Sequence, residues 1–373
     1  MIEVPCFINS VYIMLTEACP LRCKYCYIKN RDVDNEISIE TIDKTINLFS
    51  ESPQVIFFGG EPLLKLNLIK ETMKRHPNCK WQVVTNGVVN FNEFMDEVYY
   101  PNKDRFDVQL SWDGNTDSRI SVNGTNISNK VYGNLITNLD KGYYIQTRSV
   151  VSDTNIETLY DTYLKLINLR KIYPNYTPDF NFAHQISFRK EFFAQLDNQL
   201  SKIFNYIAAN TDDYIPQWIS LMLFQNLSKD PMNESCDAGS YICVRPNGDV
   251  YPCTILSQIS KEFCLGNVID KKLDFEKLNK LVQYTKCTKD CALKKYCDGG
   301  CRYERIVNYK DWENSICNHT CQIKEIVHNN IAMLFNSINY EQKLKIANKC
   351  VRYFQWMSEY NRDPIKAREI KAC

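Results

Sequence analysis

The feature that most constrains the fold is an alternation of short apolar strands with amphipathic helices. Residues 9–16, NSVYIMLT, are typical of a buried strand. Residues 38–50 follow with apolar side chains at helical spacing, behind a serine that suits a helix N-cap. Strand-like runs then recur, and helical patterns cover 66–76 and 154–171. This alternation predicts an α/β fold with a parallel sheet and right-handed crossovers.

Distinctive residues gather where the predicted strands end. In parallel sheets and barrels, functional loops lie at the carboxyl ends of the strands, so we expect one shared site there. The segments concerned are Cys19–Cys26, Gly59-Gly60-Glu61, Thr85-Asn86-Gly87 and Asp113-Gly114.

Composition indicates which partners and which cellular compartment to expect. The formal net charge is +1, which gives no support for binding nucleic acid or an anionic membrane. The N-terminus resembles no signal peptide, and no apolar run reaches the roughly 18–20 residues of a membrane span. We therefore expect a cytoplasmic protein. In that reducing compartment, 17 cysteines are better explained as metal ligands than as disulfides. Three of them lie in 19–26 and ten in 236–321.

Cys19, Cys23 and Cys26 have the spacing C-x3-C-x2-C. Three thiolates can bind three irons of a four-iron cluster and leave the fourth iron open, whereas a closed structural site needs four ligands. Two alternatives remain at this point: a zinc ion with a fourth ligand from elsewhere, or three unrelated buried thiols.

The same stretch resembles the signature of the radical S-adenosylmethionine (SAM) superfamily, with Tyr25 as its aromatic residue. FFGGEP resembles the GGE motif of that family, and VTNG (84–87) and LSWDG (110–114) resemble its later strand-end motifs. The resemblance implies a partial (β/α)6 TIM-like barrel and a catalytic [4Fe-4S] cluster on Cys19, Cys23 and Cys26. It also implies a set of SAM-binding residues: Tyr25, Gly59, Gly60, Glu61, Thr85, Asn86, Ser111, Asp113 and Arg148.

The chemistry of two of these side chains suits that role. Ionised Glu61 only accepts hydrogen bonds, which suits the ammonium group of SAM, and the planar fork of Arg148 suits its carboxylate. The resemblance implies that the reduced cluster cleaves SAM to methionine and a 5′-deoxyadenosyl radical, which removes a hydrogen atom from the substrate.

A second cysteine set resembles the SPASM domain, which usually carries two auxiliary [4Fe-4S] clusters. Its pattern here is Cys236, then Gly248-x4-Cys253, then Cys287-x3-Cys291-x5-Cys297-x3-Cys301, with one spacer a residue longer than usual. The resemblance implies that the first auxiliary cluster is held by Cys236, Cys253 and Cys301. It implies that the second is held by Cys287, Cys291, Cys297 and a final cysteine.

Two ligand assignments stay open. For the final cysteine, Cys321 is favoured over Cys317 because it directly precedes an amphipathic helical pattern. Cys243 is either the fourth ligand of the first auxiliary cluster or a small buried hydrophobe.

The expected domains are a radical SAM barrel with a bridging region (1–230), a SPASM domain with short β-hairpins (231–340) and a C-terminal helical extension (341–373). The Asn247-Gly248 pair predicts one of the hairpin turns. A C-terminal amphipathic helix is expected over 322–360.

The overall resemblance is to maturases of ribosomally made peptides (RiPPs) and to anaerobic sulfatase-maturating enzymes. It implies an oxidoreductase that forms a thioether C–S or a C–C crosslink in a precursor peptide, with the auxiliary clusters as electron acceptors. Sulfatase maturases carry an acidic residue where this chain has Thr254, which counts against formylglycine formation. A sulfatase maturase, a small-molecule dehydrogenase or epimerase, and a non-enzymatic scaffold remain alternatives.

The resemblance also implies partners. One is an electron donor such as flavodoxin or ferredoxin. The first predicted strand begins near residue 9, which leaves no room before it for an N-terminal leader-binding domain. A peptide leader is therefore expected to be bound by a separate protein, or a short motif of it by the barrel.

Overall fold

The computed structural model describes residues 4–5, 8–29, 31–184, 187–227, 238–278, 290–294, 297, 299–309 and 318–362. The chain divides into two compact units. The first unit comprises Met1–Ser111, Ile120–Asn138 and Asp237–Thr285. The second unit comprises Trp112–Arg119, Leu139–Cys236 and Lys286–Cys373.

The first unit is built on parallel strands. They are β1 (Ser10–Met14), β2 (Gln54–Phe58), β3 (Lys80–Thr85) and β4 (Phe106–Ser111), each paired in parallel with the next. On its other side β1 pairs in parallel with β7 (Ile242–Val244), so that Val11 lies opposite Ile242. Three short antiparallel strands continue the sheet: β8 (Asp249–Tyr251), β9 (Gly266–Asn267) and β10 (Lys272–Leu273). The predicted α/β fold with a parallel sheet is confirmed.

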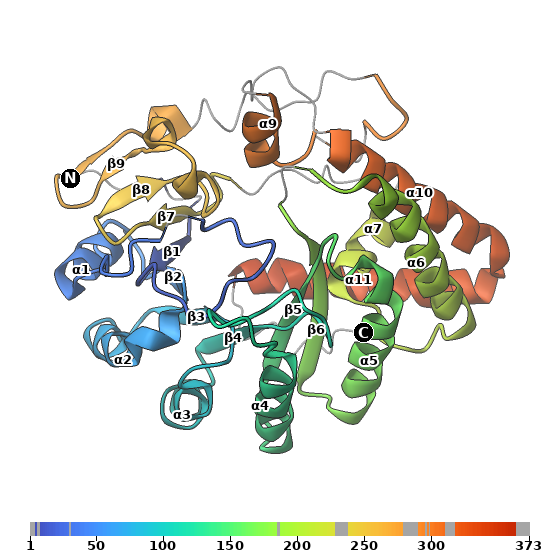
Figure 1. Ribbon diagram of the computed structural model, residues 1–373, viewed down its shortest axis with the longest axis horizontal. Helices are drawn as coiled ribbons and strands as arrows, with labels where there is room; N and C mark the ends of the chain where they lie inside the picture. Colours follow the sequence, from blue (N-terminus) through green and yellow to red (C-terminus); the bar gives the residue numbers. More distant parts are fainter. Residues whose placement is uncertain are drawn as a thin grey trace. The chain divides into compact units, whose positions relative to one another are not determined.

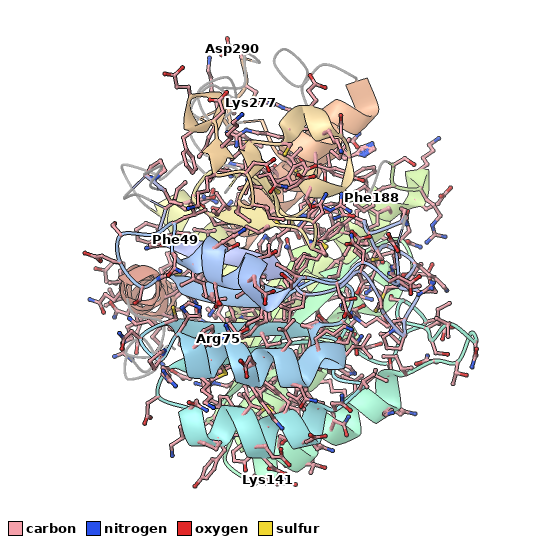
Figure 2. The ribbon with its side chains drawn as sticks, turned by 90° about the vertical axis from the view of Figure 1, so that its left-hand side faces the viewer. Phe49, Arg75, Lys141, Phe188, Lys277 and Asp290 are labelled. Atoms are coloured by element: carbon pink, nitrogen blue, oxygen red, sulfur yellow. The ribbon has the colours of Figure 1, made fainter. Side chains whose placement is uncertain are left out.

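Helices follow the strands of this unit as predicted. In α1 (Ile39–Ile46) the side chain of Ser38 accepts a hydrogen bond from Thr41 N at 3.2 Å, which confirms the predicted N-cap. The helix α2 (Leu66–Arg75) lies beside α1, and Arg75 donates to Asp43 of α1 at 2.9 Å (Figures 1 and 2). The other helical segments are η1 (Pro62–Lys65), α3 (Phe91–Phe94), η2 (Met95–Tyr99), η3 (Tyr100–Asn102), α4 (Ser128–Asp140), η5 (Leu256–Gln258) and η6 (Lys261–Phe263).

The parallel strands are buried on both faces, and this explains their nearly continuous apolar sequences. Val11, Ile13 and Phe57 have no exposed surface, and the Phe57 ring stacks on Trp81 with centroids 5.3 Å apart. Each such side chain contributes about 1.5–3 kcal/mol through its removal from water. The core therefore fixes the strands whose ends carry the predicted site.

The second unit contains the parallel pair β5 (Ile145–Val151) and β6 (Tyr176–Phe182), with a set of helices around it (Figure 1). The predicted helix over 322–360 is wrong in one respect, because the structure has two helices there. Ile338 and Asn339 separate them. Asn339 caps the second helix: Gln342 N donates to Asn339 Oδ1 at 3.0 Å, and Asn339 N donates to Gln342 Oε1 at 2.9 Å. The helical segments of this unit are η4 (Ile156–Thr158), α5 (Leu159–Ile172), α6 (Lys190–Ala209), α7 (Gln217–Leu227), α9 (Arg302–Tyr309), α10 (Asn318–Ser337) and α11 (Tyr340–Arg362).

Candidate functional site

The cysteine loop that follows β1 is the first part of the candidate site. Its three cysteines, Cys19, Cys23 and Cys26, are half-buried and carry free thiols. A turn closes between two of them, where Cys26 N donates to Cys23 O at 3.1 Å. The loop is also pinned from outside, because Arg22 N donates to Ile120 O at 2.8 Å. The first unit therefore holds the three thiols on one loop with a defined backbone path.

The glycine pair at the end of β2 packs directly against the chain that leads into this loop. Gly60 N donates to Thr16 O at 2.8 Å, and Glu61 N donates to Ala18 O at 2.9 Å. A Cβ atom on Gly60 would lie 2.1 Å from Ala18 O, and one on Gly59 would lie 2.4 Å from Thr16 O. Gly59 also has a φ of +140°, which favours glycine. The glycine pair therefore allows a close approach of backbone to the segment that leads into the cysteine loop.

Glu61 joins the ends of two neighbouring strands. Its carboxylate has no exposed surface, and it accepts hydrogen bonds from Leu63 N at 3.1 Å, Thr85 Oγ1 at 2.7 Å and Asn86 N at 2.8 Å. These donors account for the burial of a charged group. The structure thus brings Glu61, Thr85 and Asn86 together, as predicted from their strand-end positions, and it gives Glu61 a structural task besides its predicted contact with SAM.

Hydrogen-bond donors reach two of the cysteine sulfurs. Leu21 N lies 3.4 Å and Asn86 Nδ2 lies 3.7 Å from Cys19 Sγ, and Arg31 Nη2 lies 3.2 Å from Cys26 Sγ. Burial raises the pKa of the Cys19 thiol, whereas the Leu21 N–H and the Arg31 charge lower it. Donors of this kind suit sulfurs that carry negative charge as cluster ligands. The donor set of this loop therefore fits an iron–sulfur cluster.

Among the residues that the structure describes, no group of three His, Cys, Asp or Glu side chains converges to hold a single metal ion. A four-iron cluster is bound by cysteines distributed over its irons, so that its ligands need not meet at one point.

Two of the predicted SAM contacts are partly accessible. Tyr25 is half-buried within the loop, and Ser111 is half-buried at the end of β4.

The two remaining predicted SAM contacts belong to the second unit. Asp113 is buried and accepts from Arg119 at 3.0 and 3.2 Å and from Val150 N at 2.9 Å. Arg148, on β5, lies 3.6 Å from Asp179, which is opposite it on β6. Burial raises the pKa of the Asp179 carboxyl, and the Arg148 charge opposes this rise. Both predicted residues thus have defined partners, and their role in binding SAM stays a prediction.

Two cysteines of the second set lie in the first unit. Cys253 Sγ accepts from Ile255 N at 3.4 Å and from Tyr241 Oη at 3.7 Å. Cys243 is wholly buried on β7, and burial, with the nearby Cys253 as a smaller cause, raises the pKa of its thiol to about 12. The structure therefore brings Cys243 close to Cys253, and whether Cys243 is a ligand or a core residue stays open.

Thr254, which follows Cys253, lies in a cluster of neutral hydroxyl groups. Its side chain hydrogen-bonds to Tyr27 and to Tyr241, and burial raises the pKa of both tyrosines well above its usual value. Ser257 Oγ donates to Thr254 O at 2.7 Å. The position that is acidic in sulfatase maturases is thus part of an uncharged hydrogen-bond network in this chain.

The other described cysteines of the second set lie in the second unit. Cys291, Cys297 and Cys321 line a cavity of about 270 Å³, and Gly299 N donates to Cys297 Sγ at 3.3 Å. A cavity lined by three thiols fits an iron–sulfur cluster in donor type. Cys301, just before α9, is half-buried. Three predicted ligands lie outside the described residues: Cys236, Cys287 and Cys317.

Sequence reasoning missed several residues around these cysteines. Arg31 lies five residues after Cys26, the last cysteine of the C-x3-C-x2-C motif, and only its contacts show that it belongs to the surroundings of the loop. Buried Glu17 accepts from Asp32 N at 3.0 Å and pairs with Arg245, which is far away in the sequence. Lys324 lies on α10 three residues after Cys321. Residues at this spacing are neighbours on a helix surface, so the sequence could have indicated that Lys324 lies near this cysteine.

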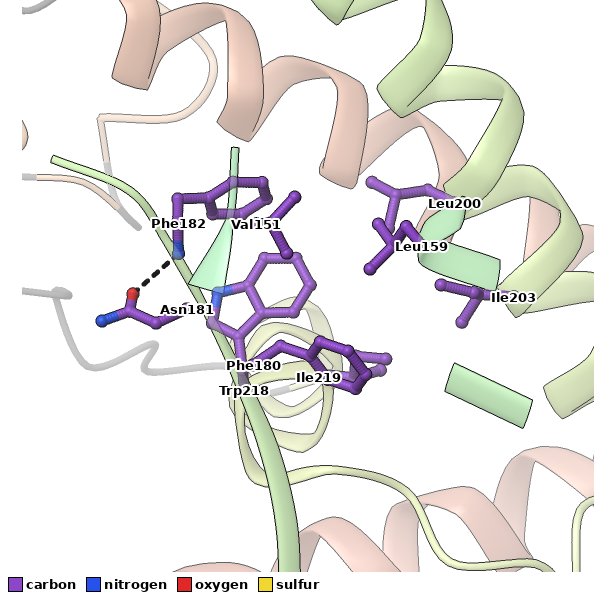
Figure 3. A pocket seen from close by; sticks show the side chains of 9 residues that line it. All are labelled: Val151, Leu159, Phe180, Asn181, Phe182, Leu200, Ile203, Trp218 and Ile219. Atoms are coloured by element: carbon purple, nitrogen blue, oxygen red, sulfur yellow. Dashed lines mark hydrogen bonds between the residues drawn. The ribbon is translucent and has the colours of Figure 1, made fainter. Parts of the chain in front are cut away.

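A second cavity, in the second unit, is lined by apolar side chains apart from Asn181 and measures only about 10 Å³ (Figure 3). Trp218 and Phe182 meet edge to face at its wall with ring centroids 5.2 Å apart. A cavity needs about 10–15 Å³ to hold one water molecule, so this space is a packing void and no substrate site.

No helix within the described part of the chain is both long enough and apolar enough to cross a membrane.

Two family models match the chain. The sequence model of the radical SAM superfamily matches residues 13–110. The SPASM model, an iron–sulfur cluster-binding domain, matches residues 223–302.

Two curated proteins illustrate the similarity. An uncharacterised protein of Methanocaldococcus jannaschii is 26% identical over 291 residues, which cover 70% of this chain and 90% of that protein. The radical SAM cyclopropyl synthase TigE of Paramaledivibacter caminithermalis is 23% identical over 286 residues, which cover 66% of this chain and 57% of TigE.

Solved structures share the fold. Native anSMEcpe with bound AdoMet and the Cp18Cys peptide has a TM-score of 0.69 at 18% identity, and the match covers 88% of this chain and 98% of that one. SuiB of Streptococcus suis, bound to the precursor peptide SuiA, has a TM-score of 0.60 at 15% identity, covering 84% and 76%. At these identities the likeness shows the fold alone. The two matches show that the chain carries a radical SAM domain followed by a SPASM domain.

Proposed function

We propose that this enzyme modifies a ribosomally made precursor peptide by oxidative crosslinking, forming a thioether C–S or a C–C bond. The observation that carries the proposal is the cysteine loop, in which donors from Leu21, Asn86 and Arg31 reach the sulfurs of Cys19 and Cys26. The peptide substrate is supported by the fold shared with SuiB and anSMEcpe, whose structures contain peptides.

In this proposal Cys19, Cys23 and Cys26 hold the catalytic cluster, and the strand-end residues around Glu61 hold SAM. When bound, the reduced cluster and SAM supply the radical chemistry that removes a hydrogen atom from the peptide. The chain's own part is to orient these groups. Glu61 fixes the loop after β2 to the end of β3, and Asp179 holds the guanidinium of Arg148.

Two auxiliary four-iron clusters are proposed to accept the electron that crosslinking releases. Cys253, with Cys236 and Cys301, would hold the first. Cys291 and Cys297, with Cys287 and Cys321, would hold the second. The cavity lined by Cys291, Cys297 and Cys321 supports the choice of Cys321 as the last ligand.

The hydroxyl cluster around Thr254 favours crosslinking over sulfatase maturation. Formylglycine formation in the maturases that this chain resembles uses an acidic residue at this position, and here Tyr27 and Tyr241 bond to a threonine instead. Each of these hydroxyls stays protonated near neutral pH, so none of them is a ready proton acceptor.

The proposal includes a cytoplasmic location, where iron-binding thiols stay reduced, and an electron donor such as flavodoxin or ferredoxin. A leader of the precursor peptide would be bound by a separate protein or by the barrel. The domain boundaries at residues 230 and 340 are part of the same proposal.

The test is the iron and sulfide content of the anaerobically reconstituted chain, with SAM cleavage as a second readout. We expect about twelve irons in the wild type, and about eight with no SAM cleavage in a Cys19/Cys23/Cys26→Ala variant. About four irons, all lost in the variant, would remove the auxiliary clusters from the proposal. Zinc in place of iron would overturn it. Mass spectrometry of short peptides encoded beside the gene, after coexpression, then tests for loss of two hydrogens per crosslink.

A further inference from the structure

Arg31 makes an unusual set of contacts with the cysteine loop. Its Nη2 donates to Cys26 Sγ at 3.2 Å, its Nη1 to Leu21 O at 2.6 Å and its Nε to Ile28 O at 3.2 Å. The two carbonyl acceptors lie on either side of Cys26 in the sequence, so one guanidinium joins the start of the loop to its end. A planar fork with five fixed donors is suited to this task, and a lysine has no equivalent geometry.

The charge of Arg31 also faces the sulfur of Cys26. Its acceptors are two carbonyl oxygens and a sulfur, and none of the three is a carboxylate. The guanidinium therefore acts directly on negative charge at Cys26, one of the three proposed ligands.

We infer that Arg31 is a positioning residue that orients Cys26 and raises the reduction potential of the cluster on this loop. The inference rests on the proposed function for the location of that cluster. A reduced cluster carries one more negative charge than an oxidised one, so a nearby positive charge and a hydrogen bond to sulfur stabilise the reduced form more. Arg31 would thereby ease the electron uptake that must precede SAM cleavage.

Arg22 provides a matched control on the same loop. Its Nη1 donates to Cys19 O at 3.0 Å and to Leu21 O at 2.9 Å, so it shares the Leu21 acceptor with Arg31. Both of these acceptors are carbonyl oxygens, and neither is a sulfur. A comparison of the two arginines thus separates a general effect of a loop cation from the effect of the contact with Cys26.

The experiment is an EPR-monitored redox titration of the reconstituted full-length chain as wild type, Arg31→Gln, Arg31→Lys and Arg22→Gln. The signal of the N-terminal cluster is identified as the one that Cys26→Ala removes. We expect the equilibrium constant for reduction of this cluster to fall about tenfold in Arg31→Gln, equivalent to about 59 mV for one electron. It should fall less in Arg31→Lys, which keeps the charge, and stay unchanged in Arg22→Gln.

Several outcomes would overturn the inference. An unchanged potential in a fully loaded Arg31→Gln variant would do so, as would an equal fall in Arg22→Gln. If Arg31→Gln fails to bind the cluster, Arg31→Lys decides: a loaded lysine variant with the wild-type potential contradicts tuning by the hydrogen bond. Loss of the cluster from both variants, with unchanged circular dichroism, would overturn the tuning of the potential and leave Arg31 a role in binding the cluster. If Cys26→Ala removes no signal, the failure lies with the proposed cluster location instead.

Discussion

The cysteine loop of the first unit and the cysteine-lined cavity of the second unit differ in what surrounds their sulfurs. In the loop, Asn86 and Arg31 extend side-chain donors to Cys19 and Cys26. In the second unit, Cys291, Cys297 and Cys321 line a cavity of about 270 Å³. A three-ligand cluster leaves one iron open for a ligand, so the protein must fix its orientation by other contacts. A four-ligand cluster is enclosed by its own ligands and needs less support from outside.

The sharpest test of this comparison is removal of a ligand from the cavity. We expect Cys321→Ala to bind about four irons fewer than the wild type, because a closed site loses its cluster with one ligand. The N-terminal EPR signal should persist. Cys317→Ala is the matched control and should keep the full iron content. Loss of iron from Cys317→Ala, with full iron in Cys321→Ala, would exchange the two assignments.

The next test concerns the packing of the glycine pair against the loop. Gly60→Ala would place a Cβ 2.1 Å from Ala18 O, so we expect it to lower the free energy of unfolding by about 3 kcal/mol and to weaken cluster binding at the loop. Chemical denaturation and iron content measure the two effects. Gly133→Ala, in α4 with no atom within 4 Å of its new Cβ, should instead stabilise by about 0.5–1 kcal/mol. Equal effects of the two changes would contradict the close approach.

Glu61→Gln tests the carboxylate that joins β2 to β3. The substitution keeps the size but replaces one acceptor oxygen by an NH2 group, which faces a donor. We expect a loss of about 2 kcal/mol in the free energy of unfolding, the usual scale for a buried hydrogen bond to a charged group. Glu93→Gln changes an exposed carboxylate of the same unit and should stay within about 0.5 kcal/mol. A neutral result at Glu61 would mean that its hydrogen bonds do not hold the site.

The smallest effect is expected at the cavity wall. Burial lowers the pKa of Lys324 from 10.5 to about 8, so the folded chain disfavours its charged form. Below pH 8 both folded and unfolded chains carry the charge, and the folded chain bears the desolvation cost. Lys324→Met should therefore stabilise the cluster-free chain by on the order of 1 kcal/mol at pH 7. This gain in the free energy of unfolding should shrink between pH 8 and 10.5, because in that range only the unfolded chain retains the proton. A gain that does not change with pH would contradict burial of the charged amine as its cause.

Local signals made much of the structure predictable. The Ser38 cap, the helix α2 and the turn at Asn247-Gly248 follow from residue chemistry within a few positions. The strand-end location of Glu61 and Asn86 follows from the rule that parallel strands present their carboxyl ends together. The break at Asn339 also has a local signal in the sequence, because Asn339 and Gln342 form a capping pair. The helical pattern continues on both sides of this pair, so the pattern alone predicts one helix.

Long-range pairings were beyond reach because a single sequence carries no signal for them. The ion pair of Glu17 with Arg245 and the pairing of β1 with β7 join segments more than 200 residues apart. Arg31 was missed for a different reason. Its contacts depend on the path of the backbone between Cys19 and Ile28, which spacing alone does not specify.

The pairing of β7 with β1 has a consequence for synthesis. Val11 and Ile242 are neighbours in the sheet, yet about 230 residues separate them along the chain. At roughly 5–20 residues per second, a ribosome needs about 10–50 s to make that stretch. Throughout this time one edge of β1 has no partner strand, and open edges recruit strands from other chains. We therefore expect the nascent chain to depend on chaperones, or on slow synthesis at low temperature, until residue 244 has left the ribosome.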